Sequence, residues 1–337
     1  MESHNTILSD DQLLTSTDSL IIQSDLTDIN LDSIGLVEEV PLFEETDINF
    51  SIVSGEAPPP LAPNTGNDTI TPSTFLLGDS NPNYLSAVSS FVESYIWGFG
   101  GNDTLVGGFN NDILNGGADN DFLDGRLGDD LLIGGAGNDT LDGNYGYDIL
   151  DGGDGIDTAT YRFWWGGIKA NLKTETVNFF NDPTSGIEYV RAIENVVGSL
   201  GNDEIIGNSA NNVLFGERGN DFLSGEEGND FLQGSENSNF VEQDTLTGGL
   251  GADTFVLGTA NGGSFYLGDG FVTITDFKWW EKDTFQVVGS INDYHLDKTQ
   301  NFGGTSLSDT AIYRGNDLIA VALDTFGIMP VFDFKSV

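Results

Sequence analysis

Residues 98–160 consist of seven consecutive nine-residue units that read GFGGNDTLV, GGFNNDILN, GGADNDFLD, GRLGDDLLI, GGAGNDTLD, GNYGYDILD and GGDGIDTAT. A second block, residues 198–256, continues the pattern as GSLGNDEII, GNSANNVLF, GERGNDFLS, GEEGNDFLQ, a longer unit from Gly234 to Thr247, and GGLGADTFV. A fixed short period sustained over two blocks indicates a solenoid in which every unit adopts the same local structure.

The last three residues of each unit are expected to form a short strand whose middle residue, position eight, points inward. Position eight is apolar throughout: Leu105, Leu114, Leu123, Leu132, Leu141, Leu150, Ala159, Ile205, Leu214, Leu223, Leu232, Leu246 and Phe255. One apolar residue per strand cannot sustain an independent sheet, so each strand must stack on copies above and below it. We therefore expect two units per turn, with one strand on each face.

Position six is the candidate metal-ligating position. It is aspartate in every unit but one: Asp103, Asp112, Asp121, Asp130, Asp139, Asp148, Asp157, Asp203, Asp221, Asp230, Asp244 and Asp253. Stacked turns would align these carboxylates in two rows with like charges about 5 Å apart, which repel unless cations lie between them. Calcium suits such rows better than magnesium because it accepts six to eight oxygen ligands in flexible geometry, including backbone carbonyls.

A single aspartate at this point of a turn is equally well explained as a cap of its own turn, through a side-chain to backbone hydrogen bond. The fixed phase of the aspartates across the two blocks favours calcium over that alternative. Asn212 is the exception, and we expect the site that would use it to be weak, because an amide supplies one oxygen and no charge.

Glycine occupies position one of every unit. We expect it to supply backbone angles that a side chain would forbid. Position two is also glycine in several units, but it is Phe99, Arg126, Glu217 or Glu226 in others, and these residues fit a left-handed turn less well.

The repeats resemble the RTX (repeats-in-toxin) hemolysin-type calcium-binding nonapeptide of bacterial toxins, proteases, lipases and alginate epimerases. The resemblance covers residues 98–256. It implies an all-β fold, a right-handed parallel β-roll or β-helix solenoid, with several Ca²⁺ ions held between turns by the position-six aspartates and turn carbonyls. The segment ITDFKWWEKDTFQV, residues 274–287, resembles the C-terminal cap of serralysin-type proteins, which implies that Asp276 and Asp283 contact a last calcium.

The rest of the chain divides into four segments around the two blocks. Residues 1–63 carry no Lys or Arg and end in a proline-rich linker, which predicts an acidic, disordered N-terminal tail. Residues 64–97 are expected to cap the start of the roll. Residues 161–197 form an aromatic-rich insertion between the blocks, and residues 257–337 are expected to form a β-rich C-terminal cap.

Charge and composition restrict the partners. The chain has 11 Lys and Arg against 54 Asp and Glu, a formal net charge of -43, and no cysteine. Such a charge disfavours nucleic acid and anionic membrane and favours cations, and the lack of cysteine excludes disulfides and thiolate metal sites.

Two features bear on localisation. The sequence shows neither a cleavable N-terminal secretory signal nor an apolar stretch long enough to span a membrane. The resemblance implies export by a type I system through an uncleaved C-terminal signal, with which Val331–Val337 is compatible. We therefore expect a secreted or cell-surface protein.

The sequence offers no catalytic motif. Its histidines are His4 and His295, so the H-E-x-x-H of zinc proteases is absent, and no G-x-S-x-G elbow occurs. We expect no enzymatic activity, and favour a calcium-binding structural or adhesive protein that folds on calcium binding.

The alternative is a polysaccharide-binding or epimerase-like module that uses the roll as a scaffold, with extracellular polysaccharide as its partner. Aromatic and acidic residues of the insertion could stack on a sugar and bind its hydroxyl groups: Phe163, Trp164, Trp165, Phe179, Phe180, Tyr189, Asp182 and Glu188. We expect these rings mainly to pack in the core or cap of a wider coil, with residues 168–172 and 192–198 as strands.

Overall fold

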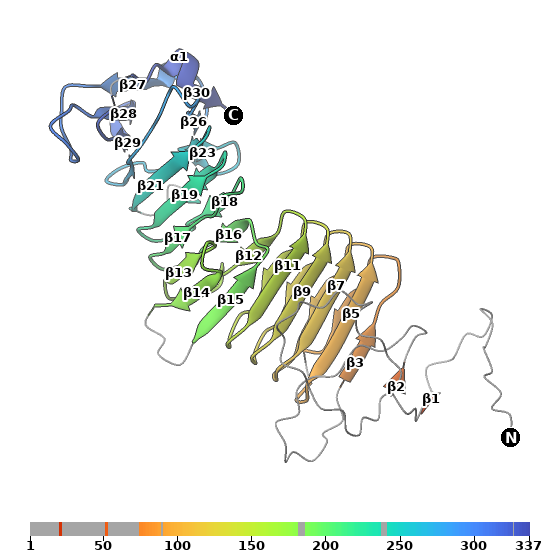
Figure 1. The fold of residues 1–337 in the computed structure, drawn as a ribbon. Coiled ribbons are helices and arrows are strands. Elements are labelled where there is room, and N and C mark those ends of the chain that lie inside the picture. The colour runs from red at the N-terminus through yellow and green to blue at the C-terminus, as the bar shows by residue number, and fades with distance from the viewer. Residues whose placement is uncertain are drawn as a thin grey trace, which may run out of the picture.

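The computed structural model describes residues 20–21, 51–52, 74–88, 90–180, 186–236, 241–325 and 327–337. Nearly all of its regular structure is β-strand, in two large sheets that run side by side along a stack of turns (Figure 1). The expected disordered tail lies outside the described residues, apart from the two-residue strands β1 (Leu20–Ile21) and β2 (Ser51–Ile52), which pair with each other.

The eleven-stranded sheet contains, in spatial order, β4 (Tyr84–Ser86), β6 (Thr104–Val106), β8 (Phe122–Asp124), β10 (Thr140–Asp142), β12 (Thr158–Thr160), β16 (Asn195–Val197), β18 (Val213–Phe215), β20 (Phe231–Gln233), β22 (Thr254–Val256), β26 (Thr284–Val287) and β30 (Phe334–Ser336).

The fifteen-stranded sheet contains β3 (Thr74–Leu77), β5 (Ser94–Gly100), β7 (Ile113–Ala118), β9 (Leu131–Ala136), β11 (Ile149–Asp154), β15 (Ile187–Arg191), β14 (Thr176–Phe179), β13 (Ile168–Asn171), β17 (Glu204–Ile206), β19 (Phe222–Glu227), β21 (Gln243–Leu250), β25 (Phe271–Ile274), β29 (Asp317–Ala322), β28 (Thr310–Arg314) and β27 (Tyr294–Asp297). Smaller elements are β23 (Gly258–Thr259), β24 (Gly263–Ser264), the 3₁₀-helix η2 (Ile291–Asp293) and α1 (Pro330–Asp333).

The register confirms two units per turn. Within the first block, Leu114 pairs with Leu132 in parallel strands β7 and β9, an offset of two nonapeptides. Leu105 pairs with Leu123 on the opposite sheet with the same offset. Every position-eight residue from Leu105 to Phe255 is completely buried, so the single apolar column predicted from the sequence is the core between the sheets.

Parallel stacking begins before the first recognised unit. Strands β3 and β4 already pair in parallel with β5 and β6, within the stretch expected to cap the roll. Residues 78–86, GDSNPNYLS, form a further unit with Asn83 at position six and Leu85 at position eight. Its weak match to the repeat explains why the sequence pattern alone did not include it.

Glycine at position one is required for a different reason from the expected one. None of these glycines has a positive φ, so the prediction of special backbone angles was wrong. A Cβ on Gly134 would instead lie 2.4 Å from Oδ2 of Asp139 and 2.6 Å from the carbonyl oxygen of Gly152, one turn further on. The residue must be glycine because an aspartate and a neighbouring turn approach its Cα closely.

Left-handed backbone lies at position two. Phe99, Arg126, Glu217 and Glu226 have φ values of 73°, 78°, 71° and 80° there, in the conformation that Gly135 adopts at the same position. Non-glycine residues in this region are strained by about 1 kcal/mol each. The stacked turns therefore hold position two in left-handed backbone even where its residue is not glycine.

The insertion bends the stack. The eleven-stranded sheet passes directly from β12 to β16 and β18, whereas the other sheet has the hairpin β13–β14 inserted between β15 and β17. Two extra strands lengthen one sheet by roughly 10 Å. Figure 1 shows the stack changing direction at this point. The strands expected at residues 168–172 and 192–198 are confirmed as β13 and β16.

Basic residues of the insertion pair with glutamates of the second block. Lys169 Nζ lies 2.7 Å from Glu204, Arg162 pairs with Glu217, and Lys173 pairs with Glu226. Two of these glutamates are the strained position-two residues, and the ion pairs partly neutralise the acidic edge of the second block.

The aromatic residues of the insertion do not share one environment. Phe179 is buried and packs on Trp164, as expected for core residues. Phe163 and Trp165 are 72% and 81% exposed, and Phe180 and Tyr189 are 38% and 47% exposed. The expectation that the rings of the insertion pack in the core or cap was therefore wrong for these four rings. Asp182 lies outside the described residues.

Strain at position two can be measured at Arg126. Arg126→Gly should be about 1 kcal/mol more stable than Arg126→Ala, because both lose the exposed ion pair with Asp124 but only glycine adopts this φ without strain. Chemical unfolding in saturating calcium measures the difference. Equal unfolding free energies for the two variants would contradict the assignment of strain.

Candidate metal centre

The twelve predicted aspartates form two buried rows, each just before the strands of one sheet. Asp103, Asp121, Asp139, Asp157, Asp230 and Asp253 precede strands of the eleven-stranded sheet, and Asp112, Asp130, Asp148, Asp203, Asp221 and Asp244 belong to the other sheet. All are at most 4% exposed. The structure therefore brings together, turn upon turn, residues that lie two units apart in the sequence.

One carboxylate oxygen of each aspartate links neighbouring turns. Oδ1 of Asp121 accepts a hydrogen bond from the backbone N–H of Asp103 at 2.7 Å, and Oδ1 of Asp139 accepts one from Asp121 at 2.8 Å. The second row repeats this contact, for example from the N–H of Asp130 to Oδ1 of Asp148 at 2.8 Å. The Oδ1 atom of each of these aspartates therefore helps to hold neighbouring turns together.

The other oxygen is left without a partner in most of the row. Oδ2 is buried and accepts no hydrogen bond in nine aspartates: Asp103, Asp121, Asp130, Asp139, Asp148, Asp157, Asp221, Asp230 and Asp253. A buried, unpaired carboxylate oxygen is strongly destabilising, because it has lost its hydration without gaining a partner. These oxygens are suited to a ligand that the polypeptide does not supply.

The orphaned oxygens converge with backbone carbonyls. Oδ2 of Asp139 and the carbonyl oxygen of Gly152 both lie close to Gly134, at 2.4 Å and 2.6 Å from the place that a Cβ would occupy. Within the described residues, no group of three or more His, Asp or Glu side chains is close enough to hold a metal ion by itself. A metal must therefore be shared between one carboxylate per unit and carbonyl oxygens, a donor set that fits a hard cation such as calcium.

Three of the predicted ligands differ from the other nine. Oδ2 of Asp112 accepts the N–H of Gly108 at 2.5 Å. Oδ2 of Asp203 accepts the N–H of Ser199 at 2.6 Å, and Oδ2 of Asp244 accepts the hydroxyl of Tyr266 at 2.5 Å. These three lie near the ends of the blocks, where protein donors already satisfy the carboxylate. The sequence pattern did not distinguish them.

Burial and mutual repulsion raise the pKa of the aspartates. Burial is the largest cause at Asp130, whose pKa is raised to about 9; the bond from the N–H of Asp112 lowers it, and the charges of Asp148 and Asp112 raise it further. Burial, followed by the charges of Asp244 and Asp203, raises the pKa of Asp221 to about 10. Without a cation these carboxyls retain protons near neutral pH, so a metal that binds them must release protons.

The insertion supplies a position-six residue, Glu188, that the sequence analysis did not identify. Glu188 precedes Tyr189 of β15 as Asp148 precedes Ile149 of β11, and it is completely buried with Oε2 unpaired. Tyr161 donates its hydroxyl to the other oxygen of Glu188. The pattern of an acid two residues before a buried apolar residue, as in Glu188 and Val190, was the available signal.

Asparagines break the row on the eleven-stranded sheet. The side chain of Asn212 accepts the N–H of Asn208 at 2.9 Å and donates to the carbonyl of Glu194 at 2.7 Å. Asn83, at the start of the row, accepts the N–H of Asp79 at 2.8 Å. Both side chains are satisfied by protein groups, and a weak site at Asn212 remains a prediction.

A second ladder, at position five, joins the turns without a metal. The side-chain oxygen of Asn102 accepts the N–H of Asn120 at 3.3 Å, and that of Asn120 accepts the N–H of Asn138 at 2.7 Å. In the second block Asn211 accepts the N–H of Asn229 at 2.7 Å. This ladder explains why asparagine or aspartate so often stands before the position-six aspartate.

The repeat geometry agrees with a family model. The model for the RTX calcium-binding nonapeptide repeat matches residues 97–132, 127–159, 195–240 and 243–262. These residues are RTX repeats. The RTX repeats bind calcium and form a parallel β-roll, and the matched ranges leave out most of the insertion and nearly all of the C-terminal cap.

Solved structures that resemble the chain include the extracellular lipase LipA from Serratia marcescens, with 17% sequence identity and a TM-score of 0.29. The match covers 74% of this chain but 42% of the lipase, so the chain spans less than half the length of that enzyme. A search of curated proteins finds no match.

Coupling between RTX turns can be tested at Asp130, in the middle of the first block. Because Asp130 bonds to both Asp112 and Asp148, Asp130→Ala should delete one site and lower calcium affinity at the adjacent sites by roughly fivefold or more. Titration calorimetry measures both effects. Asp154→Ala, which removes an exposed carboxylate from the same block, is the matched control. Unchanged affinity at the remaining sites and a Hill coefficient near one would refute the coupling.

Proposed function

We propose that calcium drives the folding of the repeat region, and that the folded roll serves as the rigid scaffold of an exported structural or adhesive protein. The nine buried Oδ2 atoms without partners carry this proposal. Each is a reason for the metal-free roll to be unstable, and each is satisfied when calcium enters between turns.

The balance of forces supports calcium-coupled folding. The core of the roll is one apolar side chain per unit, and the carboxylate rows run beside it on both sheets. A thin core of this kind offsets little of the chain entropy lost on folding. Burying the carboxyl groups opposes folding further, whether they stay charged and repel one another or keep protons at the cost of a raised pKa. Calcium converts the repulsive rows into cross-links between turns.

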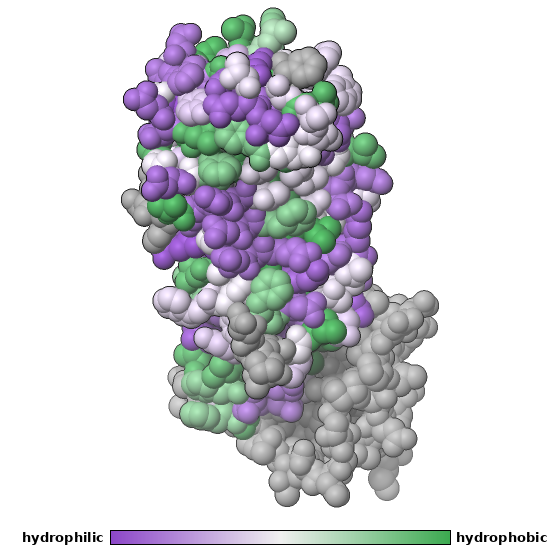
Figure 2. Space-filling model, turned by 90° about the vertical axis from the view of Figure 1, so that its left-hand side faces the viewer, coloured by the Kyte–Doolittle hydropathy of each residue, from purple (hydrophilic) through white to green (hydrophobic). Residues whose placement is uncertain are grey.

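Export is consistent with this dependence, because calcium is plentiful outside cells. The RTX repeats resemble those of proteins that leave the cell by type I secretion, and we propose the same route here. No helix in the described part of the chain is long and apolar enough to cross a membrane. Figure 2 shows hydrophilic side chains spread over one face of the stack, with apolar ones scattered among them.

We also propose that the chain is not an enzyme. His295 is exposed and stacks on the ring of Tyr313 at 5.0 Å, a contact that gives no sign of a catalytic role. His4 lies outside the described residues. In this proposal the protein acts by binding other molecules and by assembly.

Circular dichroism of the full chain tests calcium-dependent folding. In excess chelator most of the β-sheet signal should be absent, and millimolar calcium should restore it, because the orphaned carboxylate oxygens then gain a ligand. Magnesium at the same concentration is the control and should restore little, since it prefers tighter octahedral geometry. A β-sheet signal of the same size in chelator and in calcium would rule the proposal out.

A second candidate function is binding of a polysaccharide at the insertion. Its support is a pocket lined by the exposed ring of Phe163, by Trp164 and by the buried carboxyl of Asp142. Trp165, which is also exposed, follows Trp164 directly in the chain. Flat aromatic faces beside a carboxylate are a common way to bind a sugar ring and its hydroxyl groups.

A glycan array, probed with and without calcium, tests this candidate. Binding to a polysaccharide should require calcium, and Trp165→Ala should weaken it by roughly tenfold, as expected for an exposed aromatic contact. Trp280→Ala, which removes an exposed ring from the cap, is the control. Binding that is absent, or equally affected by both substitutions, would dismiss the candidate.

A further inference from the structure

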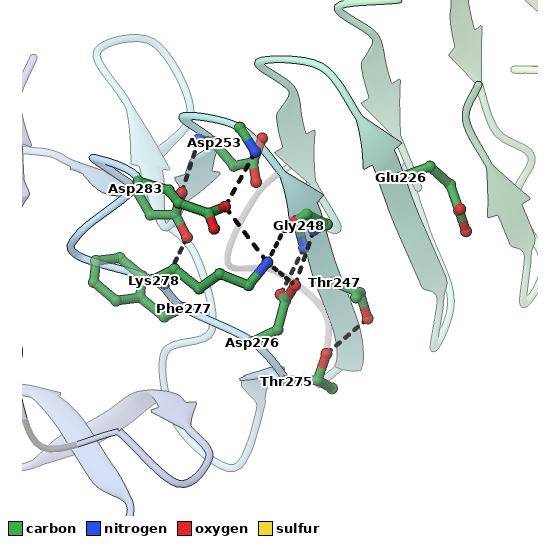
Figure 3. Close-up of polar contacts among 12 residues, drawn as sticks. Glu226, Thr247, Gly248, Asp253, Thr275, Asp276, Phe277, Lys278 and Asp283 are labelled. Carbon is green, nitrogen blue, oxygen red and sulfur yellow. Dashed lines mark hydrogen bonds and ion pairs between the residues drawn. The ribbon is translucent and has the colours of Figure 1, made fainter. Parts of the chain in front are cut away.

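The nonapeptide repeats end at residue 256, and the next layer of the stack, formed by β25 and β26, is not a repeat unit. The last unit, residues 248–256, is followed by β25 and by the segment from Thr275 to Asp283, which crosses the open end of the turn (Figure 3). At earlier turns the carbonyl of position two faces the next turn: a Cβ on Gly153 would lie 2.2 Å from the carbonyl oxygen of Gly135. The carbonyl of Gly249 faces the segment from Thr275 to Asp283 instead of another nonapeptide.

Carboxylates of the crossing segment satisfy the N–H groups of this last turn. The two oxygens of Asp276 accept the N–H groups of Gly248 and Gly249 at 2.8 Å and 2.9 Å. Glu281 accepts the N–H of Gly251 at 3.2 Å. The donors that the next repeat would have used are thereby paired.

Lys278 satisfies the carbonyl oxygen of Gly249 in this last turn. Lys278 donates its ammonium to the carbonyl oxygen of Gly249, and Nζ also lies 3.3 Å from Asp276 and 3.7 Å from Glu281 (Figure 3). Its side chain is 21% exposed, so the charge is largely enclosed by these oxygens. One carbonyl and two carboxylates around a cation resemble part of a calcium site, but the cation is covalently attached.

The carboxylate row also ends here without an orphaned oxygen. Asp283 continues the row, with Oδ1 accepting the N–H of Asp253 at 3.0 Å, like the aspartates of earlier turns. Its Oδ2, however, accepts the backbone N–H of Lys278 at 2.7 Å. Lys278 therefore supplies protein donors twice at the point where the repeat units would need a metal.

We propose that the ammonium of Lys278 is the resident cation of the terminal turn, so that the cluster of Gly249, Asp276 and Glu281 excludes calcium and the cap is closed without it. The likeness to serralysin-type caps implied the opposite, a last calcium at Asp276 and Asp283. The proposal builds on calcium binding by the repeats but does not need the repeats to be unfolded without calcium.

Locating calcium in crystals of the full chain grown in saturating calcium tests the proposal directly. Anomalous scattering should reveal calcium within the repeat blocks and none bonded to Asp276 or to the carbonyl of Gly249. Calcium at that cluster in the unaltered protein, with Lys278 displaced, would overturn the proposal whatever the variants do.

Removing the charge is the second test. Lys278→Met should gain one tightly bound calcium per chain, counted by atomic absorption after dialysis, because the two carboxylates and the carbonyl then lack a cation. Lys278→Arg should gain none. Lys335→Met, which removes an exposed lysine from β30 of the same cap, is the matched control and should also gain none.

A calcium count that is the same in Lys278→Met and in the unaltered protein would overturn the proposal. Hydrogen exchange of β26 in calcium shows whether the cap of this variant is still folded, and loss of protection there would contradict a site that calcium can fill. Failure of calcium-dependent folding would appear separately, as an unchanged β-sheet signal in chelator, and would leave this count unaffected.

Discussion

The structure depends on a single carboxylate used in two ways. One oxygen of each position-six aspartate receives an N–H from the neighbouring turn, and the other is buried near turn carbonyls without a donor. The first contact fixes the spacing and register of the turns, and the second creates the demand for a cation. Close approach of the carboxylate is also the reason for glycine at position one, so the most regular features of the repeat have one physical cause.

At three points along the rows, the polypeptide itself pairs the side-chain oxygens. Asn83 at the first turn, Asn212 after the insertion, and Asp283 with Lys278 at the last turn each have their side-chain oxygens paired within the chain. The unpaired carboxylate oxygens of the two rows therefore lie within the two repeat blocks and at Glu188 of the insertion. The ends of a solenoid need such closure, because they otherwise expose unpaired backbone groups to solvent or to other chains.

The insertion separates the two repeat blocks. The hairpin β13–β14 lengthens one sheet only, which bends the stack, and three basic residues from the insertion pair with glutamates of the second block. A bend of this kind gives the two blocks different orientations and presents the exposed rings of Phe163 and Trp165 at the junction. The exposed rings therefore lie between the two repeat blocks, where no calcium ligand was predicted.

The sequence by itself determined the period, the buried column from Leu105 to Phe255, two units per turn, and the twelve aspartates, because all of these follow from strand alternation and a strict repeat. It did not separate the three internally satisfied aspartates, Asp112, Asp203 and Asp244, from the nine with an unpaired oxygen. That distinction depends on donors such as Tyr266, which is 22 residues from Asp244. Only the tertiary structure showed this distinction. It also placed Glu188 in the carboxylate row and Lys278 on the turn that contains Gly249. Each of these depends on which distant chain segments pack against a turn, which the repeat pattern does not specify.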